Sequence, residues 1–537
     1  MIMKFKYIFF SVLLFSLTSC ETDVEDPTAV VPPAPYVGDS GSADFSSYVS
    51  LGASNASGFM DNSLFVAGQL NSFPNILAGA MSQAGGGEFT QPYVADNVGG
   101  MTVAGNEIAG ERLFFSTQSF SPQGASGAIT TDALDFQPGP YSNMSFPFVS
   151  AIHMVAPGYG NPTGLQTGTA NPWFVRAASS PSATILGDAL AQSPSFVTLV
   201  PGDDFNAWAL FGGPTDEVEL GGATGMVAGV QAVIGTLAAS VPAGVITTLP
   251  DPSITATWNT VSHNPVPLDE ATAGQLNFVF NNGCMLDEDG NPIPPNPDFD
   301  LGYNCILQFT QVPCIDMAQV GMGNFVPVAC DSAGSMDNPL FGAMSADELA
   351  SRLISFHVAT PEDVDNGDGN ALMIIDETLT AITLPLGLGE LPQIRHASEN
   401  DKISVVAGSL IPSGLGVSSP IGDGFVLLES EISTLRSQLA TANDLISSSV
   451  PEGWALFDLA GLYEEVVTTG VTMDTFTMSG DYATGGFFGL DGYYPTPRGN
   501  AFIAKRMMAA IDAVWGSNLS ESGLNIGDFP TNFPDGI

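Results

Sequence analysis

Short apolar runs alternate along the chain with longer stretches in which apolar residues recur every three or four positions. Four runs have the length and composition of buried strands: residues 46–51, 194–200, 243–249 and 454–459. Helical periodicity or composition marks the stretch from residue 55 through 81 and the segments 225–240, 429–446 and 499–515. Strands that alternate with helices in this way predict an α/β fold, with a parallel sheet covered on both faces.

Residues from about 260 to 400 interrupt this alternation with Pro, Asn, Asp and four cysteines, which predicts a large insertion in the core domain. An even number of cysteines in one short stretch favours two structural disulfides. Three pairings are open, and we expect the neighbouring pairs, Cys284–Cys305 and Cys314–Cys330. A zinc site is the alternative, but the stretch has neither a CxxC spacing nor a nearby histidine.

The N-terminus has the features of an export signal. Two lysines precede an apolar run at residues 7–19, which is too short to cross a bilayer by itself. The run ends in LTSC at Cys20, which resembles a bacterial lipobox, in which the cysteine is lipidated. We therefore expect a lipoprotein signal peptide at residues 1–19 and an acidic tether rich in Pro, Gly and Ser at residues 20–44. The alternative is an ordinary signal peptide with an unrelated cysteine.

Charge narrows the classes of partner. The chain has 11 Lys plus Arg against 56 Asp plus Glu, a net charge of −45, which excludes binding of nucleic acid through its phosphates. A 44% hydrophobic content argues against intrinsic disorder. Acidic residues 21–26 directly after Cys20 resemble the surface-export signals of Bacteroidota lipoproteins. We expect a lipid-anchored outer-membrane protein, on the cell surface rather than on the periplasmic face.

A serine lies in the turn between the first predicted strand and the residues that follow it. Residues 48–59 (YVSLGASNASGF) resemble the first block of the SGNH (GDSL-type) hydrolases, whose nucleophile corresponds to Ser54. Residues 489–500 (GLDGYYPTPRGN) resemble the last block, Asp-x-x-His followed by Pro-x-x-x-Gly.

Further stretches are similar to a Bacteroidota lipoprotein branch of this family: residues 85–92 (GGGEFTQP), 156–160 (APGYG) and 391–395 (LPQIR). The resemblance covers residues 45–515, followed by a tail at 516–537. It implies a three-layer α/β/α SGNH-hydrolase (flavodoxin-like) fold that carries the disulfide-bearing insertion.

The catalytic blocks depart from the family pattern. Ala53 replaces the acidic or amide residue before the nucleophile, and Ser145 and Phe148 stand where the family has two glycines, the first of which lends a backbone N–H to the oxyanion. Asp203 replaces the asparagine that donates to the oxyanion. A carboxylate has no proton to donate and repels the developing negative charge.

The general base is also replaced. Asp491 stands at the position of the orienting acid, but the residue three positions later is Tyr494 and not histidine. A phenol with a pKa near ~10 is a poor base at neutral pH. Of the four histidines, His153, His263, His357 and His396, we consider only His263 as a substitute base, and we expect the others to be ordinary core or surface residues.

Two acidic stretches, residues 287–291 (DEDGN) and 363–369 (DVDNGDG), carry oxygen ligands of the kind that Ca²⁺ uses. Neither fits the EF-hand spacing, and acidic clusters are common in so acidic a chain, so we expect no cofactor and retain Ca²⁺ as an alternative.

The sequence thus predicts a catalytically inactive SGNH-like lipoprotein that serves as a binding or scaffold subunit. The resemblance suggests an outer-membrane β-barrel of the fatty-acid transporter type as its partner, and acyl chains as ligands if the old cleft is open. Phe146 and Phe148 favour a filled cleft. The alternatives are an active Ser54 carboxylesterase or lipase with a rearranged site, and a polysaccharide-binding surface lipoprotein.

Overall fold

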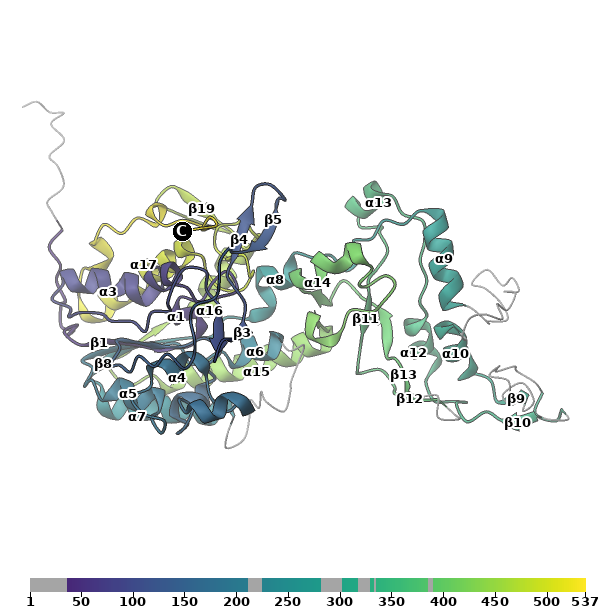
Figure 1. Ribbon diagram of the computed structural model, residues 1–537, viewed down its shortest axis with the longest axis horizontal. Coiled ribbons are helices and arrows are strands. Elements are labelled where there is room, and N and C mark those ends of the chain that lie inside the picture. The colour runs from purple at the N-terminus through teal and green to yellow at the C-terminus, as the bar shows by residue number, and fades with distance from the viewer. Residues whose placement is uncertain (1–35, 211–224, 282–301, 317–328, 333–334, 385–389) are drawn as a thin grey trace, which may run out of the picture. The chain divides into compact units, whose positions relative to one another are not determined.

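The computed structural model describes residues 36–210, 225–281, 302–316, 329–332, 335–384 and 390–537, which Figure 1 draws as ribbons. Val37–Ile537 form one compact unit, and everything below concerns this unit. The predicted signal peptide, Cys20 and most of the predicted tether lie outside the described residues. None of the helices in the described ranges combines the length and apolar character that a membrane crossing requires.

A five-stranded parallel sheet forms the centre of the unit. Its strands, in spatial order, are β6 (Asn143–Ser145), β1 (Tyr48–Gly52), β7 (Phe196–Leu199), β8 (Ala243–Thr247) and β17 (Ala455–Phe457). Four of them coincide with the predicted strands, and β6 is a strand that the apolar pattern did not indicate. The predicted α/β fold with a parallel sheet is therefore confirmed.

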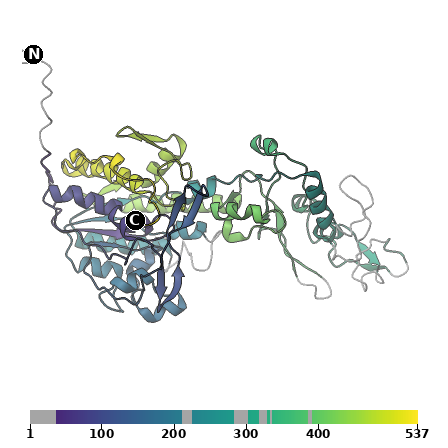
Figure 2. The ribbon, with the colours of Figure 1, turned by 45° about the horizontal axis from the view of Figure 1, so that its top comes forward.

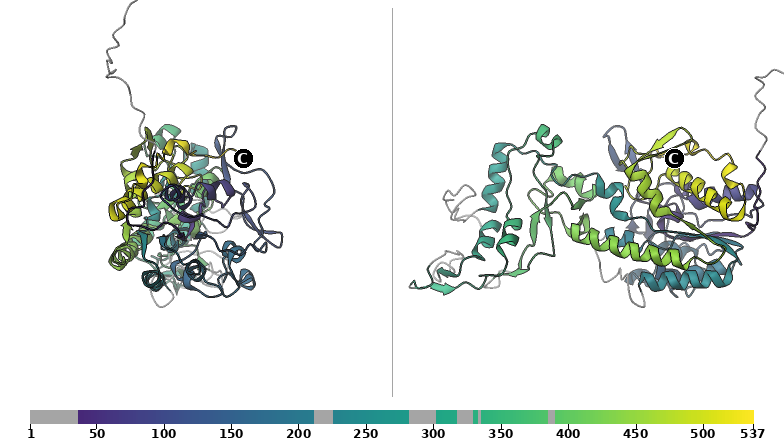
Figure 3. Two further views of the ribbon diagram at one scale, coloured as in Figure 1. Left: turned by 90° about the vertical axis from the view of Figure 1, so that its left-hand side faces the viewer. Right: turned by 180° about the vertical axis from the view of Figure 1, so that it is seen from behind.

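Helices cover both faces of the sheet. Successive strand residues point to opposite faces, and because both sets are apolar here, both faces need a covering layer. Tyr48 and Phe196 pack on one side with α3 (Phe73–Gln83), α16 (Leu459–Thr468) and α17 (Pro497–Trp515). Val49 and Val197 pack on the other side with α5 (Ile185–Leu190), α7 (Met226–Ser240) and α15 (Glu429–Ser449). Figures 1, 2 and 3 show α17 and α7 on opposite faces of the sheet.

Counted along the chain, the strands of the sheet have the order 2-1-3-4-5, which is that of flavodoxin-like doubly wound sheets. In such sheets the direction of winding reverses between the first and third strands, which here are β1 and β7. The crevice at the carboxyl ends of these two strands is the usual ligand site of the fold. Ser54 directly follows β1 and Asp203 follows β7, so the topology brings the two predicted site residues to this crevice.

The helix-like stretch through residue 81 is broken into three helices. These are α1 (Ser54–Ser57), α2 (Val66–Leu70) and α3. Gly58, Asp61 and Asn62 adopt positive φ angles of 86°, 51° and 66°, which a continuous helix does not allow. The break places Asp61 next to a segment near the C-terminus, where its carboxylate accepts the Leu490 N–H at 2.8 Å.

The two long C-terminal helices follow their predicted periodicity. In α15 the buried face contains Ile432, Leu435 and Leu439, and in α17 it contains Phe502 and Met507. One residue of the predicted buried side differs. Val514 is 46% exposed, because the buried face of the last turns of α17 runs through Met507, Ile511 and Trp515, and Val514 lies beside it.

Residues 261–428 contain two further hydrophobic clusters, a larger one that includes Val266, Phe356 and Ile374 and a smaller one that includes Leu307 and Ile382. The elements of this part are α9 (Glu270–Phe280), α10 (Tyr303–Phe309), α12 (Ala346–Arg352), α13 (Pro361–Asp365), α14 (Val405–Leu410), and the strand pairs β9–β10 (Cys314–Asp316, Ser335–Asp337), β11–β14 (Met373–Ile375, Ile394–His396), β12–β13 (Ile382–Thr383, Glu390–Leu391) and β15–β16 (Lys402–Ile403, Val426–Leu427).

The Cys314–Cys330 disulfide is present, as predicted, and closes the segment that contains β9. Cys284 lies outside the described residues, so the second bond, Cys284–Cys305, stays a prediction. Cys305 is buried in α10.

Three further hairpins and three short helices belong to the sheet-bearing part: β2–β3 (Met101–Val103, Asn106–Ala109), β4–β5 (Leu113–Ser116, Ser121–Gly124), β18–β19 (Val471–Met473, Phe476–Met478), α4 (Pro172–Ala177), α6 (Asp204–Leu210) and α8 (Ala256–Asn259).

Candidate functional site

Ser54 is the first residue of α1, at the carboxyl end of β1, and its side chain is completely buried. Its backbone N–H donates to the Asp203 carboxylate at 3.0 Å. Its Oγ accepts the backbone N–H of Phe148 at 3.1 Å. The serine is therefore held within the protein by both its backbone and its hydroxyl.

Asp203 connects the two segments that flank the serine. Its Oδ2 atom accepts the N–H of Ser54 at 3.0 Å and the N–H of Phe148 at 3.2 Å, and Asn206 donates to its other oxygen at 3.0 Å. Burial raises the pKa of this carboxyl, while the hydrogen bonds oppose the increase. A single carboxylate oxygen thus lies between two backbone donors that converge beside the serine hydroxyl.

Two converging N–H groups next to a serine Oγ form the arrangement that stabilises an oxyanion in acyl transfer. Here the position between the donors is filled by the protein's own carboxylate. A substrate oxygen would have to displace Asp203, and its developing negative charge would then lie beside a second anion.

In the part of the chain that the structure describes, the Asp491 carboxylate is bonded to backbone N–H groups and not to a side chain that could act as a base. Its Oδ1 accepts the N–H groups of Tyr493 and Tyr494 at 2.7 and 2.9 Å, and its Oδ2 accepts the N–H of Asn62 at 3.1 Å. Burial raises its pKa. This carboxylate fixes the turn that carries Tyr494.

The Tyr494 hydroxyl is buried and has no hydrogen-bond partner among the described residues. Burial holds its pKa well above the usual value, with the charge of Asp203 adding to the effect, so the phenol stays neutral. The Ser54 side chain lies close enough to the phenol to oppose this increase in pKa, although the two hydroxyls do not meet the geometry of a hydrogen bond. Tyr494 therefore does not supply the missing base.

Four aromatic residues form a cluster next to Ser54, which we call the aromatic cluster: Phe59, Phe148, Trp173 and Tyr494. The Phe59 ring packs edge to face against the rings of Phe148 and Tyr494, with centroid distances of 5.1 and 5.4 Å. The ring centroids of Phe148 and Trp173 are 5.9 Å apart. Phe146, in contrast, is buried in the main core and does not fill the cleft. Phe148 adopts a φ of 60°, a conformation that favours glycine.

A pocket of ≈ 820 Å³ lies on the other side of this cluster. Its lining includes Phe59, Phe148, Tyr494 and Asp491, but not Ser54. Residues of α8, α14 and the loop before β16 complete it, among them Trp258, Val406 and Phe425. The predicted filling of the cleft is thus only local, because the aromatic cluster separates Ser54 from a pocket that remains open.

Other predicted residues have structural contacts. Ser145 is buried at the end of β6, where its hydroxyl lies 3.4 Å from that of Ser50. His153 stacks on Tyr159 at 4.3 Å, and burial lowers its pKa. Neither residue has a hydrogen bond to Ser54 among those the structure describes.

Three of the four histidines, His263, His357 and His396, line one small pocket in the residue 261–428 part. This pocket shares no lining residue with the pocket beside Tyr494. His396 is bonded through both ring nitrogens, to Ala371 O at 2.9 Å and Ser355 N at 3.2 Å. His263, the histidine considered as a substitute base, is therefore grouped with two other histidines and not with Ser54.

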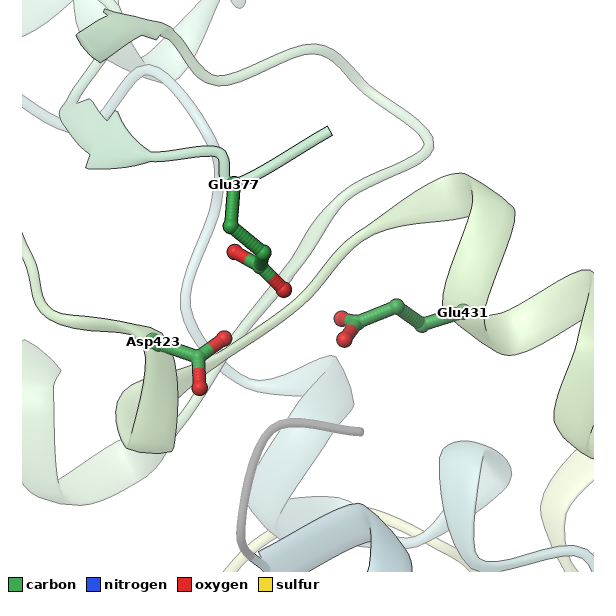
Figure 4. A group of neighbouring side chains, drawn as sticks. All are labelled: Glu377, Asp423 and Glu431. Atoms are coloured by element: carbon green, nitrogen blue, oxygen red, sulfur yellow. The ribbon is translucent and has the colours of Figure 1, made fainter. Parts of the chain in front are cut away.

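Three carboxylates gather near the start of α15: Glu377, Asp423 and Glu431 (Figure 4). Their oxygens lie within 4.8 Å of one another. Burial and the neighbouring negative charges raise the pKa of Asp423 to about 6 and that of Glu431 to about 8. Protonation therefore relieves much of the repulsion, and Glu431 also accepts the Leu428 N–H at 2.8 Å as a helix cap.

Two acidic stretches were considered for Ca²⁺, and neither contributes a carboxylate to the group in Figure 4. Residues 287–291 lie outside the described residues. In the second stretch the Asp363 carboxylate accepts the backbone N–H and the hydroxyl of Thr360, both at 2.7 Å, as the cap of α13.

Sequence reasoning missed the pocket beyond the aromatic cluster. Phe59, Trp258, Val406 and Phe425 come from segments far apart in the chain, and no local pattern marks them as neighbours. In the sequence, only the short motifs around Ser54 and Asp491 pointed to this region. They indicate the crevice at the ends of the strands but not the residues that cover it.

Comparison of the chain with protein-family models, with curated proteins and with solved structures found no match.

Proposed function

We propose that the protein is a catalytically inactive SGNH-hydrolase-like lipoprotein, anchored to the outer membrane through Cys20, that acts as a binding or scaffold subunit. The observation that carries the proposal is the position of Asp203, whose Oδ2 accepts both the Ser54 and the Phe148 N–H. The donors that an acyl-transfer site needs are already satisfied by a negatively charged group of the protein.

Three more features support the loss of hydrolysis. Ser54 is fully buried, Tyr494 stands where a base is needed, and the Asp491 carboxylate is bonded to backbone N–H groups. In serine hydrolases, loss of the base alone lowers turnover by on the order of 10⁶. An outer-membrane β-barrel of the fatty-acid transporter type is the partner that we propose, on the resemblance alone.

The competing function is an esterase that uses Asp203 itself as the base for Ser54. The same carboxylate would then occupy the oxyanion position, so one group would have to serve two incompatible roles.

A fluorophosphonate probe tests the proposal, because it reacts only with an activated serine. We expect no adduct on Ser54 in the purified protein, measured by intact mass and peptide mapping, with Ser54→Ala as the control. A stoichiometric adduct that disappears in Ser54→Ala would overturn the proposal and favour the esterase.

A further inference from the structure

Residues 533–537, which we call the strap, lie against the base of the β4–β5 hairpin, from which they are far apart in the sequence. The Asp535 carboxylate accepts the backbone N–H and the hydroxyl of Ser126, both at 2.7 Å. Ser126 lies just after the end of β5 at Gly124. Figure 1 shows the end of the chain close to β4. The strap is thus attached to the hairpin through a carboxylate and two donors.

Arg112, the residue before β4, makes the second attachment, and its side chain is buried. Its Nε donates to Asn97 O at 2.8 Å and its Nη1 to Leu113 O at 3.3 Å. Its Nη2 donates to Pro534 O at 2.6 Å, and its Nη1 lies 3.5 Å from Phe533 O. A buried cation needs acceptors for its protons, and two of these four carbonyl oxygens belong to the strap.

An aromatic contact completes the attachment. The Phe533 ring packs edge to face on the buried Phe65 ring, with a centroid distance of 5.4 Å. The Arg112 guanidinium carbon lies 5.3 Å from the centroid of the same Phe65 ring. The surface therefore recognises a ring, a backbone carbonyl and a carboxylate in three successive residues of the strap. Side-chain features read at fixed spacing along an extended backbone are typical of peptide recognition.

The β4–β5 hairpin depends on contacts outside itself. A two-stranded hairpin is only marginally stable in water, and Phe120 near its tip is 79% exposed. Four of its residues, Leu113, Ser121, Pro122 and Gln123, line the pocket of ≈ 820 Å³. The position of the hairpin therefore fixes one wall of that pocket.

We propose that the strap is an exchangeable peptide ligand of the site formed by Phe65, Arg112 and Ser126, and that its release loosens the β4–β5 hairpin and the pocket wall. Release leaves Arg112 Nη2 without its acceptor and the Ser126 donors without theirs. A peptide with the same ring, carbonyl and carboxylate can then take the place of the strap. The inference concerns the pocket wall and does not depend on the reactivity of Ser54.

Amide hydrogen exchange of a variant that lacks residues 533–537 tests the proposal. We expect residues 113–125 to exchange roughly 10-fold or more faster, because the hairpin opens more often. The β18–β19 hairpin is the internal reference. Its Asp474 accepts the Ile526 N–H at 3.0 Å, a contact that precedes the strap, so its exchange should not change. Unchanged exchange of residues 113–125 would overturn the inference, and so would equal acceleration of both hairpins.

A peptide added in trans tests whether the site is exchangeable. We expect TNFPDGI, which copies residues 531–537, to restore slow exchange in the shortened variant. The same peptide with alanine in place of Phe533 and Asp535 should restore it only at concentrations roughly 10-fold or more higher. The inference fails if the unaltered peptide has no effect or if both peptides act equally.

A point variant of the full chain serves if the shortened variant does not fold. Asp535→Ala removes the acceptor of both Ser126 donors, so we expect faster exchange of residues 113–125. Asp528→Ala removes a carboxylate from an exposed position in the same part of the chain and is the matched control. Equal exchange in the two variants would overturn the inference.

Discussion

At the scale of single residues, Phe148 connects the hydrogen bonds around Ser54 with the aromatic cluster. Its N–H donates to Ser54 and to Asp203, and its ring contributes to the aromatic cluster. Its φ of 60° disfavours a residue with a Cβ by roughly 1–2 kcal/mol. The backbone thus adopts a conformation that favours glycine, while the side chain adds a ring to the aromatic cluster next to the serine.

Asp203 imposes a second block that is independent of the missing base. Tyr494→His would place an imidazole near Ser54, but the Asp203 carboxylate would still occupy the two donors. We expect this single variant to remain unlabelled by the fluorophosphonate, and the double variant with Asp203→Asn, which removes the negative charge, to be labelled measurably more.

The measurement is the yield of labelled Ser54, determined by mass spectrometry for the single and double variants, with Asp203→Asn alone as the control. If Tyr494→His is labelled as strongly as the double variant, the carboxylate is not a block.

At the scale of secondary structure, the apolar runs predicted most of the sheet because central parallel strands are buried on both faces. β1, β7 and β8 could be located in this way, whereas β17 is an edge strand in which Leu456 is 39% exposed, and its apolar composition alone marked it. β6 could not, since its three residues, Asn143 to Ser145, are buried but include two polar side chains. The break at Gly58, Asp61 and Asn62 was missed because tertiary contacts, not local propensity, decide it.

The site itself was predictable only in part. The order of segments on the sheet explains why Ser54 and Asp203 meet, since both follow neighbouring strands. What could not be read from the sequence is that Asp203 accepts the serine's own N–H, or that α8 and α14 supply the outer wall of the pocket. Both depend on long-range packing that leaves no periodic signal.

At the scale of the whole molecule, buried carboxyl groups make the stability of the folded protein depend on pH. Burial raises the pKa of Asp61 and of Asp204 to about 7. A carboxyl whose pKa is higher in the folded than in the unfolded state holds its proton more tightly when folded. Its contribution to stability is therefore complete below about pH 4 and is lost as the pH rises to about 7.

We therefore expect the free energy of unfolding to fall between pH 5 and pH 8. Asp204→Asn should flatten this dependence, because asparagine can still accept the Ala151 N–H that Asp204 accepts at 2.9 Å. Each unit of pKa shift corresponds to about 1.4 kcal/mol, so a change of about 1–3 kcal/mol across this interval is expected from urea unfolding.

Asp528→Asn removes the same charge from an exposed position and serves as the control for net charge. An equal flattening in both variants would show that surface repulsion, and not the buried carboxyl, causes the pH dependence.

The central claim is that Ser54, although it lies beside two converging backbone N–H groups, does not cleave esters. Incubation with methyl decanoate, followed by quantification of ester and acid by mass spectrometry, tests this directly. The account predicts no release of decanoate above that of the Ser54→Ala variant. Release of decanoate that requires Ser54 would contradict it.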